Sequence, residues 1–259
     1  MRRLIAFPCG GDTLAGTLDA GNATTGLLIV SGGNEVRAGA HRGMAHLAAR
    51  LAADGTPVFR YDRRGVGDSG GTPCDNANAA ADLAAAIAAF RHEAPHLTRI
   101  VAFGNCDAAT LLAFHGRASG IDCVVLANPW IATEPDALPP ATAIRARYVD
   151  RLRHPAEWLR LLRGGVDIRK LVNGLRKLIH SPSQRSSDAV PLRVAISAWG
   201  ADATVILAQG DATAIAFAAA MRDAAFNTVT IPTASHSFAR TADAAALERA
   251  IREVIRRLP

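Results

Sequence analysis

The chain has 259 residues, 49% of them hydrophobic and 20% charged, with a formal net charge of +6. This composition excludes a disordered chain, and no apolar run approaches the roughly 20 residues of a membrane span. The four cysteines (Cys9, Cys74, Cys106, Cys123) are too scattered for a disulfide framework or a zinc ribbon. Because no long apolar stretch follows the basic N-terminus, we expect a cytoplasmic globular protein.

Short apolar runs alternate with helical segments in the first half of the chain. We expect strands at 26–30, 56–61, 98–103 and 121–127, separated by helices at 42–54, at 76–90 and up to 115. Apolar strands that alternate with helices at this spacing predict a parallel sheet covered on both faces.

This alternation stops after residue 130. The stretch 141–180 is helical and rich in arginine, without a strand signal, and the alternation then resumes. The later elements are strands at 203–208 and 227–231 and helices at 214–225 and 243–258. We therefore expect one α/β domain, formed by residues 1–130 and 201–259, with a helical insertion at 131–200.

The segment 104–108, Gly-Asn-Cys-Asp-Ala, links a predicted strand to a predicted helix. This context matches a nucleophile elbow, G-x-Nuc-x-G, whose strained turn needs small residues two positions before and after the nucleophile. Gly104 and Ala108 are small, and Cys106 stands where serine is usual. A thiol at a helix N-terminus is favoured as thiolate by the helix dipole, so Cys106 is the candidate nucleophile.

Two other interpretations of this segment stay open. Cys106 could be a buried small apolar residue at a strand end. An elbow centred on Asp107, as in enzymes with a carboxylate nucleophile, is a poorer match because Asn105 then stands where a small residue is needed.

A cysteine nucleophile needs a base and an acid that orients it, in the chain order nucleophile, acid, histidine. Asp211 follows the strand at 203–208, and His236 lies in a loop after the strand at 227–231. Asp211 could also be an N-cap, a role that can coexist with catalysis. Asp202 is the fallback acid, but it precedes its strand. The other seven histidines lie in helical or basic contexts.

An acyl-transfer site also needs two backbone N–H groups as an oxyanion hole. We expect one from Asp107, the residue after the nucleophile, and the other from Gly33 or Asn34, in the loop after the first predicted strand. Gly32 and Gly33 could instead form an ordinary turn. Nucleotide binding is not favoured, since this loop has neither G-x-G-x-x-G nor a GK[ST] sequence.

Residues 60–69, Arg-Tyr-Asp-Arg-Arg-Gly-Val-Gly-Asp-Ser, are similar to the R-x-D-x-R-G-x-G-x-S loop of the α/β-hydrolase superfamily. With Gly-Asn-Cys-Asp-Ala and Gly32-Gly33-Asn34-Glu35, nearly the whole chain resembles this superfamily. It looks most like the exosortase A system-associated hydrolases of exopolysaccharide-producing bacteria, which carry a comparable G-x-C-D-x-A elbow.

This resemblance implies an α/β-hydrolase fold, with a mostly parallel sheet, helices on both faces and a helical lid within 131–200. It implies Cys106 as nucleophile, Asp211 as acid and His236 as base, but no known substrate. Genes of that family occur with acyl-activating and acyl-carrier functions, which hints at thioester chemistry.

The expected activity is that of a thioesterase or acyltransferase with an acyl-Cys106 intermediate and no metal or other cofactor. One alternative is a hydrolase-fold protein that has lost catalysis and serves in binding or assembly. Another is binding to an anionic membrane through the basic amphipathic stretch 158–163. That stretch also fits a lid helix whose apolar side covers the active site.

The positive charge is concentrated in the predicted lid. Residues 141–180 hold ten basic and three acidic side chains, so this segment carries +7 and the rest of the chain −1. Such a patch suits an acidic acyl carrier protein, a coenzyme A phosphate or an anionic lipid surface, although a solvated helical face is the alternative. Nucleic acid is not an expected partner, because no nucleic-acid-binding motif is present and aromatic residues are scarce.

Overall fold

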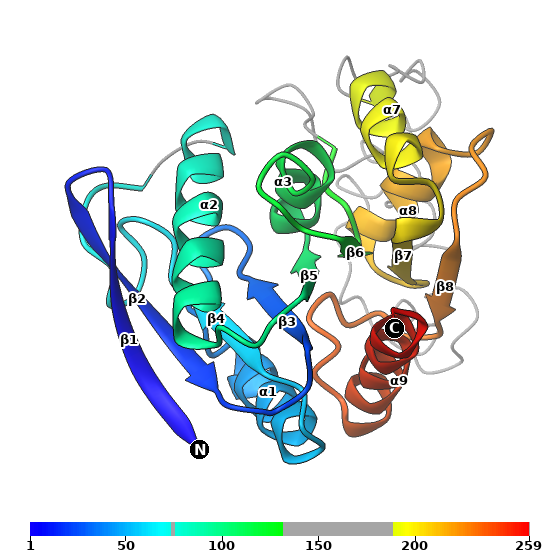
Figure 1. Cartoon of the computed structure of the whole chain (residues 1–259). Coiled ribbons are helices and arrows are strands. Elements are labelled where there is room, and N and C mark those ends of the chain that lie inside the picture. The colour runs from blue at the N-terminus through cyan, green and yellow to red at the C-terminus, as the bar shows by residue number, and fades with distance from the viewer. Residues whose placement is uncertain (74–75, 132–188, 259) are drawn as a thin grey trace, which may run out of the picture.

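The computed structural model describes residues 1–73, 76–131 and 189–258. Within these residues an eight-stranded sheet forms the centre of the molecule, in the order β1-β2-β4-β3-β5-β6-β7-β8 (Figure 1). The strands are β1 (Arg2–Cys9), β2 (Asp12–Asp19), β3 (Thr25–Val30), β4 (Val58–Tyr61), β5 (Arg99–Asn105), β6 (Cys123–Ala127), β7 (Ala203–Ala208) and β8 (Thr228–Ile231).

The strands from β3 to β8 pair in parallel, which confirms the predicted parallel sheet. Every residue of β3 and β6 is buried, as expected of strands that are covered on both faces. The hairpin of β1 and β2 was not predicted from the sequence; it adds to the sheet through the antiparallel pairing of β2 with β4.

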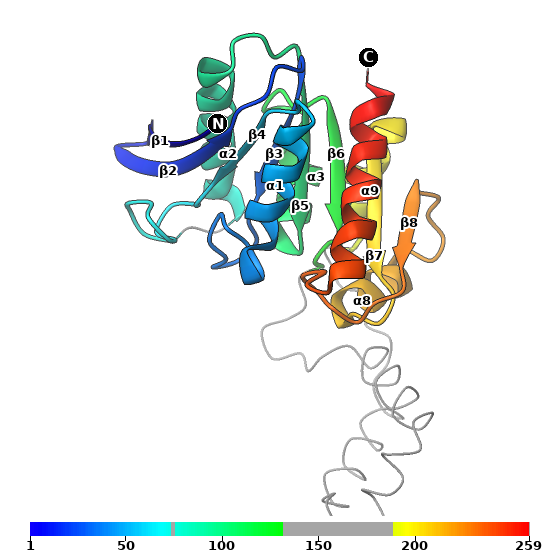
Figure 2. The same ribbon diagram turned by 90° about the horizontal axis from the view of Figure 1, so that it is seen from below.

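Helices cover both faces of the sheet (Figure 2). Buried residues of α1 and α9 pack on one face, and those of α2, α3, α7 and α8 pack on the other. The helices are α1 (Gly43–Ala53), α2 (Asn76–Glu93), α3 (Asp107–His115), α7 (Ala189–Trp199), α8 (Ala212–Ala220) and α9 (Thr241–Arg257). Among the described residues, no helix is long and apolar enough to cross a bilayer.

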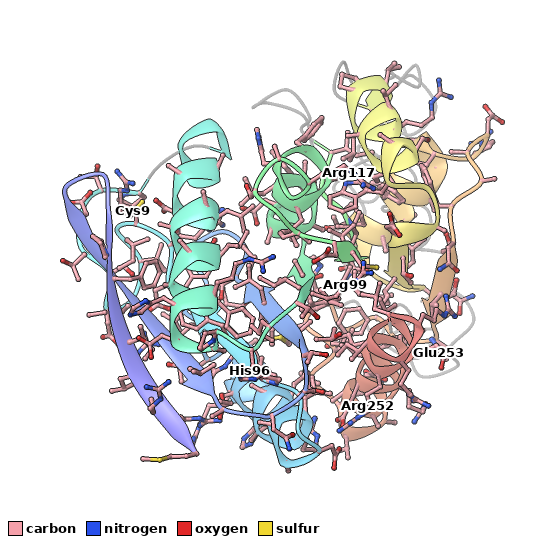
Figure 3. The ribbon with its side chains drawn as sticks, in the orientation of Figure 1. Cys9, His96, Arg99, Arg117, Arg252 and Glu253 are labelled. Carbon is pink, nitrogen blue, oxygen red and sulfur yellow. The ribbon has the colours of Figure 1, made fainter. Side chains whose placement is uncertain are left out.

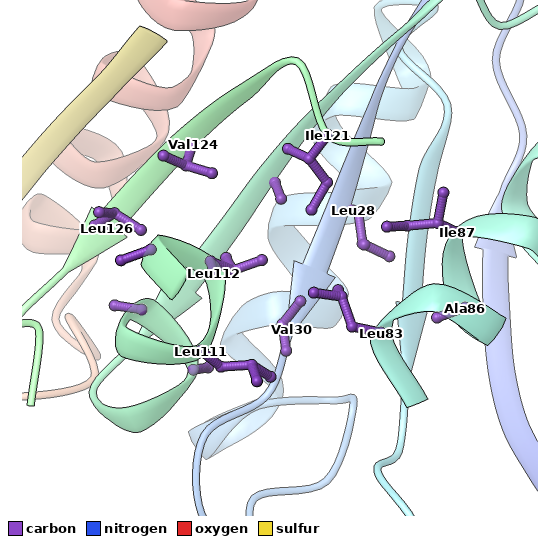
Figure 4. Packing of buried hydrophobic residues seen from close by; sticks show 14 of the residues in the cluster. Leu28, Val30, Leu83, Ala86, Ile87, Leu111, Leu112, Ile121, Val124 and Leu126 are labelled. Carbon is purple, nitrogen blue, oxygen red and sulfur yellow. The ribbon is translucent and has the colours of Figure 1, made fainter. Parts of the chain in front are cut away.

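The apolar core between the sheet and α2 and α3 fixes the position of α3. Leu28 and Val30 of β3 belong to the same buried cluster as Leu83 of α2 and Leu111 and Leu112 of α3 (Figure 4). Burying each such side chain contributes about 1.5–3 kcal/mol. The turn that joins β5 to α3 is therefore held between two well-packed elements.

Most of the predicted lid, 131–200, lies outside the described residues, and so does the whole basic segment 141–180. The last part of this range is α7, which packs against α3. Trp199 Nε1 donates to the Ala113 carbonyl at 3.0 Å, and the guanidinium of Arg117 lies 4.5 Å from the centre of the Trp199 ring (Figure 3). Residues 189–199 are thus in contact with the α/β core.

Candidate active site

The turn between β5 and α3 is strained at Cys106, which has φ 62° and ψ −125°. Holding a residue other than glycine in such a region costs on the order of 1–3 kcal/mol. Gly104 is required here, because a Cβ at this position would lie 2.7 Å from the carbonyl carbon of Ala108. Asp107 is the first residue of α3, so the turn is centred on Cys106 and not on Asp107.

Asp211 and His236 meet at the carboxyl ends of β7 and β8. The Nδ1 of His236 lies 3.0 Å from Asp211 Oδ2. The same oxygen accepts hydrogen bonds from the backbone N–H groups of Thr213 and Ala214, both at 3.1 Å. Asp211 is therefore an N-cap of α8 and the partner of His236 at the same time. Asp202 lies before β7 and pairs with Arg117 instead.

The electrostatics of the pair favour a charged imidazole. Hydrogen bonds to Asp211 and to the Cys106 side chain raise the pKa of His236 to about 10, against the effect of burial. Burial alone would raise the pKa of Asp211, but its hydrogen bonds with His236 and with the α8 backbone lower it.

Gly33 and Asp107, two of the residues predicted to form the oxyanion hole, are hydrogen-bonded to each other. The N–H of Gly33 donates to Asp107 Oδ1 at 2.7 Å. Arg63 Nη2 donates both to Asp107 Oδ2, at 2.7 Å, and to the Gly33 carbonyl, at 2.9 Å. The Gly33 N–H is therefore engaged by a side chain, whereas the Asn34 N–H donates to no other described residue.

Arg63 lies in the loop that follows β4, and the other residues of the motif 60–69 hold this loop in place. Asp62 is fully buried and accepts from the Asp68 N–H at 3.0 Å. Gly67 has φ +57°, and a Cβ there would collide with the Asp62 carboxylate. Ser69 Oγ donates to the Asp62 carbonyl at 2.7 Å. The motif thus orients Arg63 toward the site, a role that sequence reasoning missed.

Two asparagines at the site were also missed. The side-chain amides of Asn105 and Asn128 both donate to the backbone carbonyl of His236. No sequence pattern indicated a role at the site for either residue. Among the described residues, no group of three or more His, Cys, Asp or Glu is arranged to hold a metal ion.

The strand order, the strained cysteine between a strand and a helix, and an Asp–His pair at later strand ends define an α/β-hydrolase fold. The sequence model of the serine aminopeptidase, S33, family matches residues 22–246. The chain belongs to this hydrolase family. The family is named for serine, whereas Cys106 occupies the elbow here.

Solved structures with the same fold span nearly the whole chain. The esterase Pf2001 of Pyrococcus furiosus has a TM-score of 0.64 at 18% identity, over 99% of this chain and 90% of that one. The thioesterase domain from the curacin biosynthetic pathway has a TM-score of 0.59 at 16% identity, over 97% of this chain and 99% of that one. Proline iminopeptidase of Mycobacterium smegmatis has a TM-score of 0.60 at 15% identity, over 99% of this chain and 100% of that one. Curated proteins give no significant match.

Proposed function

We propose that this protein is a cysteine-dependent hydrolase that cleaves an acyl thioester or ester through an acyl intermediate on Cys106. The observation that carries the proposal is the pairing of His236 with a carboxylate and with a thiol. Its Nδ1 lies 3.0 Å from Asp211 Oδ2, and a hydrogen bond with the side chain of Cys106, at the strained turn, contributes to the raised pKa of its ring. A nucleophile, a base and an acid that orients the base are the three groups that such catalysis needs.

The first step is acylation of the thiol. An imidazolium beside the sulfur favours the thiolate, which is the nucleophilic form of cysteine. The sulfur attacks the acyl carbonyl carbon, an S–C bond forms, and the electron pair of the carbonyl moves onto oxygen. When the tetrahedral intermediate collapses, the leaving thiolate or alkoxide takes the proton that His236 holds. Asp211 keeps the ring oriented throughout.

The second step is deacylation. His236, now neutral, removes a proton from water, and the hydroxide attacks the thioester carbon on Cys106. The S–C bond breaks, the acid leaves, and the proton on His236 restores the thiolate–imidazolium pair. An acceptor hydroxyl or amine in place of water would make the same site an acyltransferase.

The oxyanion formed in both steps needs two N–H donors. The proposal assigns one to Asp107, the residue after the nucleophile at the start of α3. Gly33 supplies the second only when the Asp107 carboxylate leaves its N–H, and Asn34 offers an N–H in the same turn. The assignment of the second donor therefore depends on how Asp107 moves.

For the substrate, the chemistry of sulfur favours a thioester, since an acyl-cysteine exchanges readily with thiols. Similar folds include a protein described as an esterase and one described as a thioesterase domain. We further propose that the acyl group is carried by coenzyme A or by an acidic acyl carrier protein. The only support for this carrier is the positive charge of residues 141–180, which would attract either one. That segment lies outside the described residues, as does the stretch proposed for membrane contact.

Intact-protein mass spectrometry after incubation with a panel of acyl thioesters and activated esters tests the proposal. We expect an adduct of acyl mass on the wild type, released with time, and no adduct on Cys106→Ala. Cys123→Ala is the matched control, because Cys123 is buried next to Asp202, away from the triad. No adduct and no turnover in the wild type would contradict the proposal and favour a binding protein.

A further inference from the structure

The backbone carbonyl of His236 is held by two side-chain amides. Asn105 Nδ2 donates to it at 3.1 Å, and Asn128 Nδ2 donates to it at 3.2 Å. We propose that Asn105 and Asn128 form an amide clamp that positions His236 against Cys106, a role that rests on the proposed function. Both asparagines are positioning residues, since they act on the histidine through its backbone.

Asn128 connects the chain segments that carry the three proposed catalytic residues. It is fully buried at the end of β6, with φ +42°. Its N–H donates to the Ile206 carbonyl at 2.9 Å, and its Oδ1 accepts from the Ala208 N–H at 2.9 Å. Ala208 ends β7, three residues before Asp211. Asn128 therefore connects the segment that carries the acid to the loop that carries the histidine.

Asn105 closes the clamp on the nucleophile side. It precedes Cys106 in the chain, and its Oδ1 accepts from Asn128 Nδ2 at 3.0 Å. The polar atoms of both amides are thus hydrogen-bonded within the site. Asn128 Nδ2 donates both to Asn105 Oδ1 and to the His236 carbonyl. A buried amide that loses a partner costs about 1–3 kcal/mol, so the network resists partial opening.

The histidine needs this support because its side chain is not enclosed. The His236 side chain is 38% exposed, and its ring is held by Asp211 and Cys106. A displacement of about 1 Å at a reacting group can cost up to 100-fold in rate. If the carbonyl of His236 is released, the imidazole moves relative to the sulfur and the thiolate–imidazolium pair weakens.

The test compares Asn105→Ala and Asn128→Ala with the control Asn227→Ala, which removes an amide bonded to Thr204 Oγ1 at 2.9 Å near the opposite end of β7. We expect kcat for an acyl thioester to fall about tenfold or more in the clamp variants, with KM changed by less than about twofold. Alkylation of Cys106 by iodoacetamide, followed by peptide mass spectrometry, should slow at neutral pH. The control should match the wild type in both measurements.

Asn128→Ala is the variant at risk of unfolding. The deciding variant is therefore Asn105→Ala, at a half-buried position, after a melting curve has shown that it is folded. If Asn105→Ala has the alkylation rate and the kcat of the wild type, the clamp proposal is overturned. Alkylation is measured without an acyl substrate, so it tests the amide clamp independently of the proposed hydrolase activity. A wild type without turnover, but with Asn105-dependent alkylation, would contradict the hydrolase and support the clamp.

Discussion

Asp107 Oδ1 accepts a 2.7 Å hydrogen bond from the backbone N–H of Gly33, so a carboxylate oxygen already occupies this donor. A Cβ on the adjacent Gly32 would lie 2.7 Å from the same oxygen and 3.7 Å from the Cys106 Cβ, which places the carboxylate beside Cys106. In the proposed mechanism, a substrate oxyanion must displace this carboxylate before Gly33 can stabilise it.

We therefore expect Asp107→Ala to speed the acylation of Cys106 by a small activated ester, because it frees the Gly33 N–H and removes a negative charge. The gain should be about three- to tenfold, which is less than the roughly 100- to 1,000-fold that one fully engaged oxyanion donor supplies. Stopped-flow acylation rates measure it. Asp107→Asn keeps an oxygen on Gly33 without the charge and separates the two effects. Slower acylation of a folded Asp107→Ala would show that Asp107 anchors the loop instead.

The ion pair of Arg63 with Asp107 should stabilise the fold, since their side chains are only 8% and 19% exposed. Arg63→Met leaves the carboxylate poorly compensated, and we expect a loss of about 1–3 kcal/mol in unfolding free energy. A double-mutant cycle with Asp107→Ala, measured by urea denaturation, should show coupling. The exposed pair Arg257–Glu253 is the control, with coupling below about 0.5 kcal/mol. Additive effects at Arg63 and Asp107 would contradict this.

The pKa of His236, raised from 6.5 to about 10, has a consequence for stability. Cys106 can supply the proton that His236 holds in the wild type, so the effect is clear only in Cys106→Ala, where Asp211 still raises the pKa of His236. In that variant the folded chain holds a proton that the unfolded chain releases above pH 6.5, so the stabilisation is complete below pH 6.5 and is lost as the pH rises through the raised pKa. Urea midpoints should thus fall as the pH rises above 6.5 in Cys106→Ala but not in the double variant with His236→Gln. His46→Gln in the same background, at an exposed position of α1, is the control, and parallel curves for Cys106→Ala with and without His236→Gln would refute the expectation.

The strained elbow should not tolerate a larger residue at Gly104. In Gly104→Ala the new Cβ meets backbone atoms of Ala108 and Ala109 at 2.7–2.9 Å, so the turn must shift. We expect a loss of about 1–3 kcal/mol in stability, with acylation of Cys106 reduced as well. Gly43→Ala is the matched control, because nothing lies within 4 Å of its Cβ and its φ of −56° suits alanine. Equal thermal melts for both variants would be the contrary result.

Much of the parallel sheet could be predicted from sequence because each buried strand is a short continuous apolar run followed by a helix. The elements missed are of another kind. The hairpin of β1 and β2 exposes one face, with Leu4 77% exposed and Phe7 buried, so it has no such run. Helix α7 falls within the predicted insertion 131–200, where no separate helix was predicted, and its residues Leu192 and Ile196 pack into the core.

The strained turn at Cys106 could be predicted for a local reason: a strand, a tight turn with small residues and a helix follow one another within a few residues. The order of Cys106, Asp211 and His236 along the chain follows from the order of the strands. The clamp of Asn105 and Asn128 had no such signal. Asparagine at a strand end is common, and only the folded sheet brings the His236 carbonyl to both amides.

The net charge of +6 comes from the insertion and not from the hydrolase core, and the sequence alone is enough to show this distribution. Within the core, the sequence also determined the fold class, because burial patterns and turn residues are local properties. Which groups touch at the site was decided by the tertiary structure. The engagement of Gly33 by Asp107 joins residues 74 positions apart, and such contacts depend on how parallel strands align their ends in space.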